Sequence, residues 1–256
     1  MPSRDLMIDT ADGRCPATLF LPDTRPEDPE TGVILYMDAF GPRPALVEMA
    51  ERIANAGHLV LLPDLFYRHG EYGPFDVKTA FSHEETAKQI KGMMGDTTQA
   101  MTQSDSRAFI DVLAKEGAQS IGTVGYCMGG GRAINAAAAY PDEIKAAASF
   151  HGGGLASDAE DSPHRKADKL KARIYVGSAG VDNSFPPEQS ARLEQAFRSA
   201  EVDYAIENYV GMKHGWTVPD LSVYDAVGAE RHWRRLLTLF SETLGSGSSA
   251  QQQPIA

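Results

Sequence analysis

The chain has 256 residues, of which 42% are hydrophobic and 23% charged, so it can bury a core and is not expected to be disordered throughout. Acidic residues outnumber basic ones, 35 to 24, and the formal charge of −11 argues against nucleic acid and anionic membranes as partners. No apolar run approaches the ~18 residues of a membrane span, and the first residues lack the apolar region of a signal peptide. We therefore expect a cytoplasmic protein.

The apolar pattern predicts strands and helices that alternate along the chain. Two short strands, 6–9 and 15–21, flank Asp12-Gly13, which is a hairpin signal, and a loop rich in proline and acid follows at 22–31. Further strands are expected at 32–37, 58–62, 120–126, 146–150, 172–177 and 203–210. Helices are expected at 44–56, 96–115, 129–140, 186–200 and 226–244.

This alternation is typical of an α/β fold with a mostly parallel twisted sheet and helices on both faces. The initial hairpin would add antiparallel strands at one edge. We found no internal repeat and no linker that divides the chain. The sequence therefore predicts a single domain over residues 1–244, followed by a low-complexity tail at 245–256.

The chain has two cysteines, which exclude a disulfide framework and a cysteine-rich zinc module. Cys15 lies in an early strand. Cys127 lies in the segment 125–129, Gly-Tyr-Cys-Met-Gly, between a predicted strand and a predicted helix. This is the Gly-x-nucleophile-x-Gly form, with cysteine where serine is usual.

The chemistry of such a turn explains its residues. A nucleophile on a sharp strand-to-helix turn has a strained backbone, and glycine two residues away on either side avoids a steric collision. The sulfur then lies at a helix N-terminus, where N–H groups and the helix dipole favour a thiolate. The pattern predicts a nucleophilic Cys127, the alternative being a buried structural cysteine packed among glycines.

A thiol is only a few per cent ionised at pH 7, so the nucleophile needs a base. In this architecture an acid and then a histidine follow the nucleophile along the chain. Asp182 comes after the strand at 172–177, and His214 comes after the strand at 203–210, both at the rim where open α/β sheets build their sites. The alternatives to Asp182 lie upstream of that strand: Asp158, Asp161 and Asp168.

The other six histidines carry weaker signals. His151 directly follows a predicted strand and precedes three glycines, so we expect it to line the pocket. The remaining five are expected to be structural or solvated: His58, His69, His83, His164 and His232.

Several ordered motifs resemble those of the dienelactone hydrolase family of α/β-hydrolases, over about residues 32–244. Residues 125–130, Gly-Tyr-Cys-Met-Gly-Gly, look like the nucleophile motif of that family, cysteine included. Residues 35–41, Leu-Tyr-Met-Asp-Ala-Phe-Gly, resemble its first-strand motif, which normally has a glutamate before x-Phe-Gly. Residues 62–66, Leu-Pro-Asp-Leu-Phe, match its Pro-Asp-Leu segment.

The resemblance implies hydrolysis of a small ester or lactone, of the carboxymethylenebutenolidase type, through a thioester acyl-enzyme and without a cofactor or metal. It implies a catalytic triad of Cys127, His214 and Asp182. It also implies an oxyanion hole made by the backbone N–H groups of Ala39 and Met128.

Two features depart from the family pattern. Asp38 stands where the family has a glutamate that helps to activate the thiol; we expect the same role from it, with a loop-capping carboxylate as the alternative. Family members that act on dienelactone hold its carboxylate with arginines, one shortly after the catalytic histidine. Residues 215–220, Gly-Trp-Thr-Val-Pro-Asp, contain none, and nothing in the sequence brings Arg68 or Arg107 to the site.

Phe40, His151 and Trp216 are expected to contact the substrate. Two other functions remain open at this point. One is a non-catalytic protein of the same fold that binds a small ligand or senses oxidants through Cys127. The other is a cysteine peptidase, which the elbow context and the Cys–Asp–His order disfavour.

Overall fold

The computed structural model describes residues 2–23 and 31–245. Most of the predicted loop at 22–31 and of the tail at 245–256 lies outside the described residues. The strands are β1 Ser3–Thr10, β2 Gly13–Phe20, β3 Thr31–Tyr36, β4 His58–Pro63, β5 Ser120–Tyr126, β6 Ile144–Phe150, β7 Arg173–Val181 and β8 Tyr204–Lys213. The α-helices are α1 Pro44–Asn55, α2 Glu84–Asp96, α3 Gln99–Lys115, α4 Met128–Ala139, α5 Pro187–Ser199 and α6 Ala226–Leu244. Short 3₁₀ helices lie at Tyr67–His69 and Pro163–Lys169.

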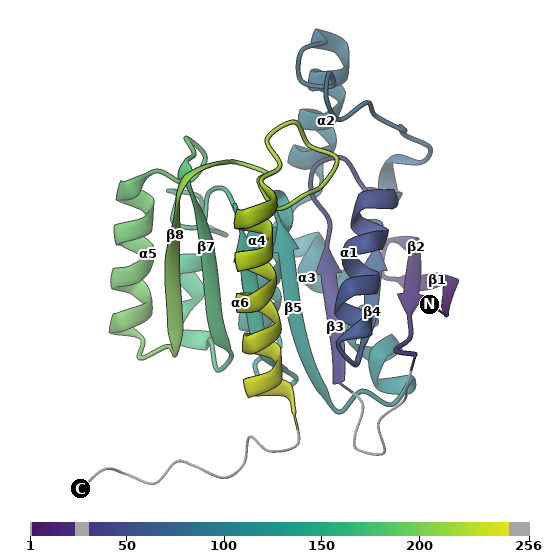
Figure 1. Ribbon diagram of the computed structural model, residues 1–256. Coiled ribbons are helices and arrows are strands. Elements are labelled where there is room, and N and C mark those ends of the chain that lie inside the picture. Colours follow the sequence, from purple (N-terminus) through teal and green to yellow (C-terminus); the bar gives the residue numbers. More distant parts are fainter. Residues whose placement is uncertain (1, 24–30, 246–256) are drawn as a thin grey trace, which may run out of the picture.

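The described strands form one eight-stranded sheet in the order β1-β2-β4-β3-β5-β6-β7-β8. β1 and β2 pair antiparallel, β2 runs antiparallel to β4, and the strands from β4 to β8 are parallel. The predicted fold class is therefore confirmed, with the antiparallel hairpin at one edge (Figure 1).

Helices cover both faces of the sheet, and two adjacent residues of β5 show how. A Cβ at Gly122 would lie 2.8 Å from the Phe240 ring of α6, while the Thr123 hydroxyl donates to the Ala133 carbonyl of α4. Because neighbouring side chains of a strand point to opposite faces, α6 and α4 lie on opposite sides of β5. The parallel strands β3 and β4 are buried almost throughout, as their continuous apolar sequences predict.

Three local predictions needed correction. The hairpin turn is Ala11-Asp12, because Gly13 already pairs with Thr10 as the first residue of β2. The helix predicted at 96–115 begins at Gln99, where the Thr98 side chain accepts from the Met101 N–H as an N-cap. A separate helix, α2, precedes it; its sequence contains Gly92 and Gly95 and buries few side chains, so its apolar periodicity is weak.

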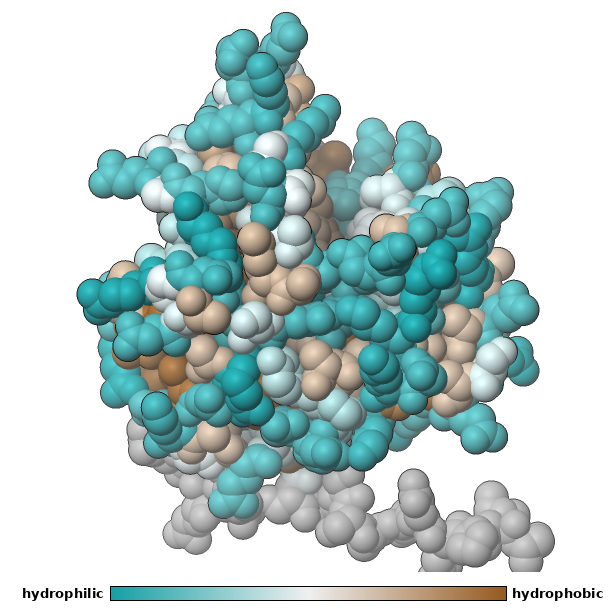
Figure 2. Space-filling view, turned by 180° about the vertical axis from the view of Figure 1, so that it is seen from behind, coloured by the Kyte–Doolittle hydropathy of each residue, from teal (hydrophilic) through white to brown (hydrophobic). Residues whose placement is uncertain are grey.

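The back of the molecule, seen from the side away from the viewer of Figure 1, is mostly hydrophilic (Figure 2). Figure 2 shows the face opposite to that of Figure 1, where apolar side chains occur only in small separate groups between hydrophilic ones. Within the described ranges, none of the helices is both long enough and apolar enough to cross a lipid bilayer.

Candidate active site

Cys127 occupies the sharp turn between β5 and α4. Its backbone has φ 55° and ψ −119°, in the left-handed half of conformational space that residues with a side chain rarely adopt. The Cys127 N–H donates to the Phe150 carbonyl of the neighbouring β6, at 3.2 Å. This contact ties the turn to the sheet, so the surrounding structure holds the strained residue in place.

The two glycines of the motif allow the close approach that the turn requires. A Cβ at Gly125 would lie 1.9 Å from the Gly129 carbonyl oxygen, and one at Gly129 would lie 2.3 Å from the Tyr36 carbonyl oxygen of β3. Both distances are far below a van der Waals contact with rigid backbone. Any larger residue must therefore push α4 away from the sheet.

We expect Gly129→Ala to destabilise the protein by about 1–3 kcal/mol, because overpacking against backbone forces a shift. The shift carries Cys127 with it, and a displacement near 1 Å lowers kcat/KM for ester hydrolysis by roughly 100-fold. Urea unfolding and steady-state kinetics measure the two effects. Gly92→Ala in α2 is the matched control, because a Cβ there meets no atom within 4 Å and should stabilise the helix slightly. Equal behaviour of both variants would contradict the expectation.

Asp182 and His214 meet at the C-terminal ends of β7 and β8. The His214 Nδ1 and the Asp182 Oδ2 are 2.7 Å apart, and the Asp182 side chain is only 4% exposed. The other oxygen, Asp182 Oδ1, accepts from the Ser184 backbone N–H at 2.8 Å and from its hydroxyl at 2.6 Å. Both carboxylate oxygens are thus held, and the imidazole is oriented by a nearly buried acid.

Electrostatics favour the charged form of this pair. Burial alone would lower the pKa of His214, but the Asp182 carboxylate and the hydrogen-bonded Cys127 thiol raise it from its usual value near 6.5 to about 10. Burial would raise the pKa of Asp182, while the hydrogen bonds from His214 and Ser184 hold it below its usual value. The surroundings of the His214 ring therefore favour its protonated form.

These shifts predict how the pair stabilises the fold. A histidine with a raised pKa stabilises fully below its unfolded pKa near 6.5, and this effect is lost as pH rises toward about 10. Because the pKa of Asp182 is lowered in the folded protein, its carboxylate contributes stability above about pH 4, and this contribution is lost at more acidic pH. The Tm difference between wild type and His214→Gln should be widest between about pH 4 and 6.5 and should shrink toward pH 10. A difference that widens from pH 7 to 10 would refute this.

Asp38 is bound by Arg43, a residue to which no sequence motif pointed. The Arg43 Nη1 and Nη2 donate to the two oxygens of Asp38 at 2.7 and 2.9 Å, and the Phe40 N–H donates to Oδ1 at 3.0 Å. Arg43 also donates from Nε and Nη2 to Asp220, at 2.7 and 3.0 Å, and from Nη1 to the Gly41 carbonyl, at 3.3 Å. All five N–H groups of Arg43 are therefore used.

Arg43 thus clamps the segment 38–43 to the loop that follows His214. Its side chain is only 11% exposed, and this partial burial alone would lower its pKa, but hydrogen bonds with Asp220 and Asp38 raise it above the usual value. The clamp contains one cation and two carboxylates, so it has a net negative charge. Whether Asp38 also activates the thiol stays a prediction.

The N–H groups expected to form an oxyanion hole come from the two segments just described. Ala39 directly follows Asp38, and Met128 is the first residue of α4. Within the described ranges, neither N–H has a backbone acceptor outside its own helix or strand. Their role stays a prediction.

The three residues expected to contact the substrate lie in different environments. Phe40 is half-buried and packs edge-on against Phe81, with ring centroids 5.5 Å apart. His151 and Trp216 are 1% and 0% exposed, and their rings pack against each other at 5.2 Å. In this structure both rings form the interior support of the site rather than its surface.

The alternatives weighed from the sequence lie elsewhere. Asp158, Asp161 and Asp168 are exposed, and Asp158 pairs with Arg192. Arg68 pairs with Asp12 and Asp105, and Arg107 pairs with Asp111 and Glu143. Cys15 is fully buried in β2, and this burial, together with the nearby Asp105 and Asp64, raises the pKa of its thiol. Cys15 is therefore a poor nucleophile at neutral pH.

Sequence reasoning missed three residues of the site: Arg43, Ser184 and Thr217. Ser184 had a usable signal, since a serine two residues after an aspartate often closes a turn on its carboxylate. No local pattern distinguishes Arg43 or Thr217. Within the described residues, no group of three His, Cys, Asp or Glu side chains is arranged to hold a metal ion.

The sequence and the fold have known relatives. The profile of the dienelactone hydrolase family matches residues 16–244. The carboxymethylenebutenolidase of Rhodococcus opacus is 26% identical, over 85% of this chain and 83% of its own. A Synechocystis sp. protein provisionally named carboxymethylenebutenolidase is 27% identical, over 83% of this chain and 86% of its own.

Solved structures of dienelactone hydrolase-like proteins have a similar fold. The dienelactone hydrolase-like promiscuous phosphotriesterase P91, from metagenomic libraries, is 25% identical with a TM-score of 0.75, over 96% of this chain and all of the other. The dienelactone hydrolase of Anabaena variabilis shares the fold, at 16% identity and a TM-score of 0.60, over 95% of this chain and 99% of its own. The family profile covers most of the chain and confirms the resemblance that its motifs indicated. The chain therefore belongs to the dienelactone hydrolase family and is a carboxylic ester hydrolase with the α/β-hydrolase fold.

Proposed function

We propose that the protein hydrolyses a small ester or lactone by covalent catalysis, with Cys127 as nucleophile, His214 as base and Asp182 as the acid that orients it. The observation that carries this proposal is the pairing of His214 with a nearly buried Asp182, next to a thiol held on a strained strand-to-helix turn. A thiol, a base that contacts it and an acid that orients the base form the arrangement required for nucleophilic acyl transfer.

The reaction follows from these positions. The Cys127 sulfur, with its proton transferred to His214, attacks the ester carbonyl carbon. The carbonyl oxygen becomes negative and is stabilised by the N–H groups of Ala39 and Met128. When the bond to the alcohol oxygen breaks, His214 returns its proton to that oxygen, and a thioester remains. A water that His214 deprotonates then attacks the thioester, releasing the acid and restoring the thiol. For a lactone, the leaving alcohol stays on the same molecule.

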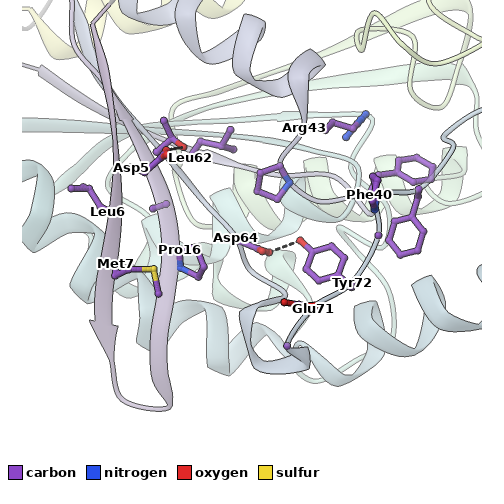
Figure 3. A pocket seen from close by; sticks show the side chains of 17 residues that line it. Asp5, Leu6, Met7, Pro16, Phe40, Arg43, Leu62, Asp64, Glu71 and Tyr72 are labelled. Atoms are coloured by element: carbon purple, nitrogen blue, oxygen red, sulfur yellow. Dashed lines mark hydrogen bonds between the residues drawn. The ribbon is translucent and has the colours of Figure 1, made fainter.

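A cavity beside the oxyanion segment offers space for part of a substrate. It has a volume of about 820 Å³ and lies between the β1–β2 hairpin and the loop at 70–75. Figure 3 shows Leu6, Met7 and Pro16 on one side of it and Phe40 and Tyr72 on the other. Phe40 and Arg43 belong both to this cavity and to the segment 38–43, whereas none of the three proposed catalytic residues lines it. We propose that part of a substrate lies in this cavity and reaches Cys127 past that segment.

The charges around this cavity favour an uncharged substrate. Among the described residues, the acidic and basic side chains that line it are Asp5, Asp64, Glu71 and Arg43, and Arg43 has no N–H left for a ligand. A carboxylate on the substrate would meet a net negative field, and the described lining residues offer no free cation to pair with it. We therefore propose neutral esters or lactones as the substrate class, in contrast to a carboxylated lactone.

A matched pair of substrates tests both parts. We expect hydrolysis of p-nitrophenyl acetate. The p-nitrophenyl ester of monomethyl succinate is neutral, whereas p-nitrophenyl hemisuccinate carries a carboxylate. We expect kcat/KM for the neutral ester to be higher by about 10-fold or more, or ~1.4 kcal/mol. Asp220→Asn removes one negative charge from the clamp, so it should reduce this ratio several-fold. Preference for the carboxylate, or for a dienelactone over neutral lactones, would overturn the substrate class, and no hydrolysis of any ester would overturn the reaction.

A further inference from the structure

His151 is a buried residue with an unusual backbone, and the proposed reaction does not use it. It directly follows β6, is 1% exposed, and has φ 41°. Non-glycine residues in this region are strained, and they persist where surrounding contacts hold them, often at functional sites. The contacts of the His151 ring therefore indicate what holds this strained residue in place.

The two ring nitrogens of His151 have fixed and different roles. The Cys127 backbone N–H is shared between the Phe150 carbonyl, at 3.2 Å, and Nδ1 of His151, at 3.1 Å, so Nδ1 presents a lone pair to it. Nε2 lies 2.8 Å from the Thr217 hydroxyl oxygen, so Nε2 must carry the ring proton and donate it. A neutral imidazole satisfies both bonds, and an imidazolium satisfies only one.

The surroundings keep this ring neutral. Burial, followed by the nearby His214 and His232, lowers the pKa of His151 well below its usual value. The His214 ring packs against it in a T-shaped arrangement with centroids 5.1 Å apart, and the Tyr126 ring lies 5.9 Å away. A neutral His151 leaves the charge on His214, where the proposed reaction needs it, and avoids two adjacent cations.

The partners of His151 belong to the two segments that must meet in the reaction. Cys127 begins the nucleophile turn, and Thr217 lies three residues after His214 in the same loop. We propose that His151 is a positioning residue whose neutral ring ties the nucleophile turn to the loop of the base and so fixes the distance between sulfur and imidazole. The effect of this tie on catalysis rests on the proposed function, whereas its test, the alkylation of Cys127, does not require an ester substrate.

The competing explanation is a histidine that merely fills the core, and the chain contains one for comparison. His232 in α6 is 0% exposed and bonds to the Tyr126 hydroxyl and the Ala229 carbonyl, so it touches the end of β5 but bonds neither to Cys127 nor to the loop that follows His214. His232→Gln is therefore the matched control for the loss of a buried histidine.

Alkylation of Cys127 by iodoacetamide tests the tie without any ester, because the rate and its pH midpoint report the sulfur and its base directly. His151→Asn keeps an acceptor near Nδ1 and tolerates the left-handed backbone, but it cannot reach Thr217. Thr217→Val removes the same bond from the other side. Cys15 contributes little background, because burial raises the pKa of its thiol.

We expect each single variant to lower the alkylation rate and kcat by about 10-fold, to raise the pH midpoint of alkylation, and to leave KM within about 2-fold. Both single variants break the same hydrogen bond between His151 and Thr217. The alkylation rate and kcat of the double variant should therefore lie within about 2-fold of those of either single variant. His232→Gln should keep the wild-type rate and midpoint. If His151→Asn does not fold, Thr217→Val decides alone.

Wild-type rates and midpoints in folded His151→Asn and Thr217→Val, or losses that multiply in the double variant, would overturn the proposal. An unchanged His232→Gln together with losses in the tie variants supports it. If wild type hydrolyses no ester, the proposed function fails, while the alkylation comparison still decides the role of His151.

Discussion

Cys127→Ala is expected to lower kcat/KM for ester hydrolysis by on the order of 10⁴-fold or more, because the variant has no atom that can form the acyl-enzyme. Alanine fits the space of the thiol, so the fold and its Tm should change little. The measurement compares purified wild type and variant on p-nitrophenyl acetate and on a dienelactone, with circular dichroism to check folding.

Cys15→Ala is the control for this prediction. Cys15 lies fully buried in β2, where its thiol donates to the Asp64 carbonyl at 3.4 Å, so its loss should cost some stability and leave the rate unchanged. The same contrast applies to iodoacetamide, which should inactivate wild type by modifying Cys127. Activity of Cys127→Ala close to wild type on both substrates would exclude Cys127 as the nucleophile.

Asp182→Asn should lower kcat by roughly 10³–10⁴-fold with KM almost unchanged. The amide is nearly the same size as the carboxylate, but it has no charge to stabilise the imidazolium of His214, 2.7 Å away, and it can stabilise the wrong tautomer. The variant should also lower the pKa of His214 toward its usual value, because the Asp182 carboxylate is a main cause of the upward shift. Titration of the His214 ring by NMR measures this second effect.

Asp158→Asn is the matched control, because sequence reasoning left this residue open as the acid. Its side chain is 93% exposed and pairs only with Arg192 in the described structure, so its substitution should change kcat by less than about 2-fold. Equal losses in the two variants, or a loss below 10-fold in Asp182→Asn, would remove Asp182 from the proposed triad.

The sequence by itself determined the α/β fold class, the order of most strands and helices, and the turn that carries Cys127. These features depend on local patterns: continuous apolar strands, helical periodicity, and glycines on both sides of the nucleophile. It also indicated Asp182 and His214, since each follows a predicted strand and parallel strands end at a common edge. Helix α2 escaped prediction, because its two glycines and few buried residues leave a weak periodic signal.

Only the tertiary structure decided what the polar side chains of the site are bonded to. Arg43 bonds to Asp220, 177 positions later in the sequence. His151, after β6, bonds both to Cys127, after β5, and to Thr217, after β8. Such contacts depend on which strands become neighbours and on how the loops after them meet, which no local pattern encodes. Tertiary packing also decided the environment of Trp216, which was expected to form an aromatic wall and is fully buried against the rings of His151 and Tyr209.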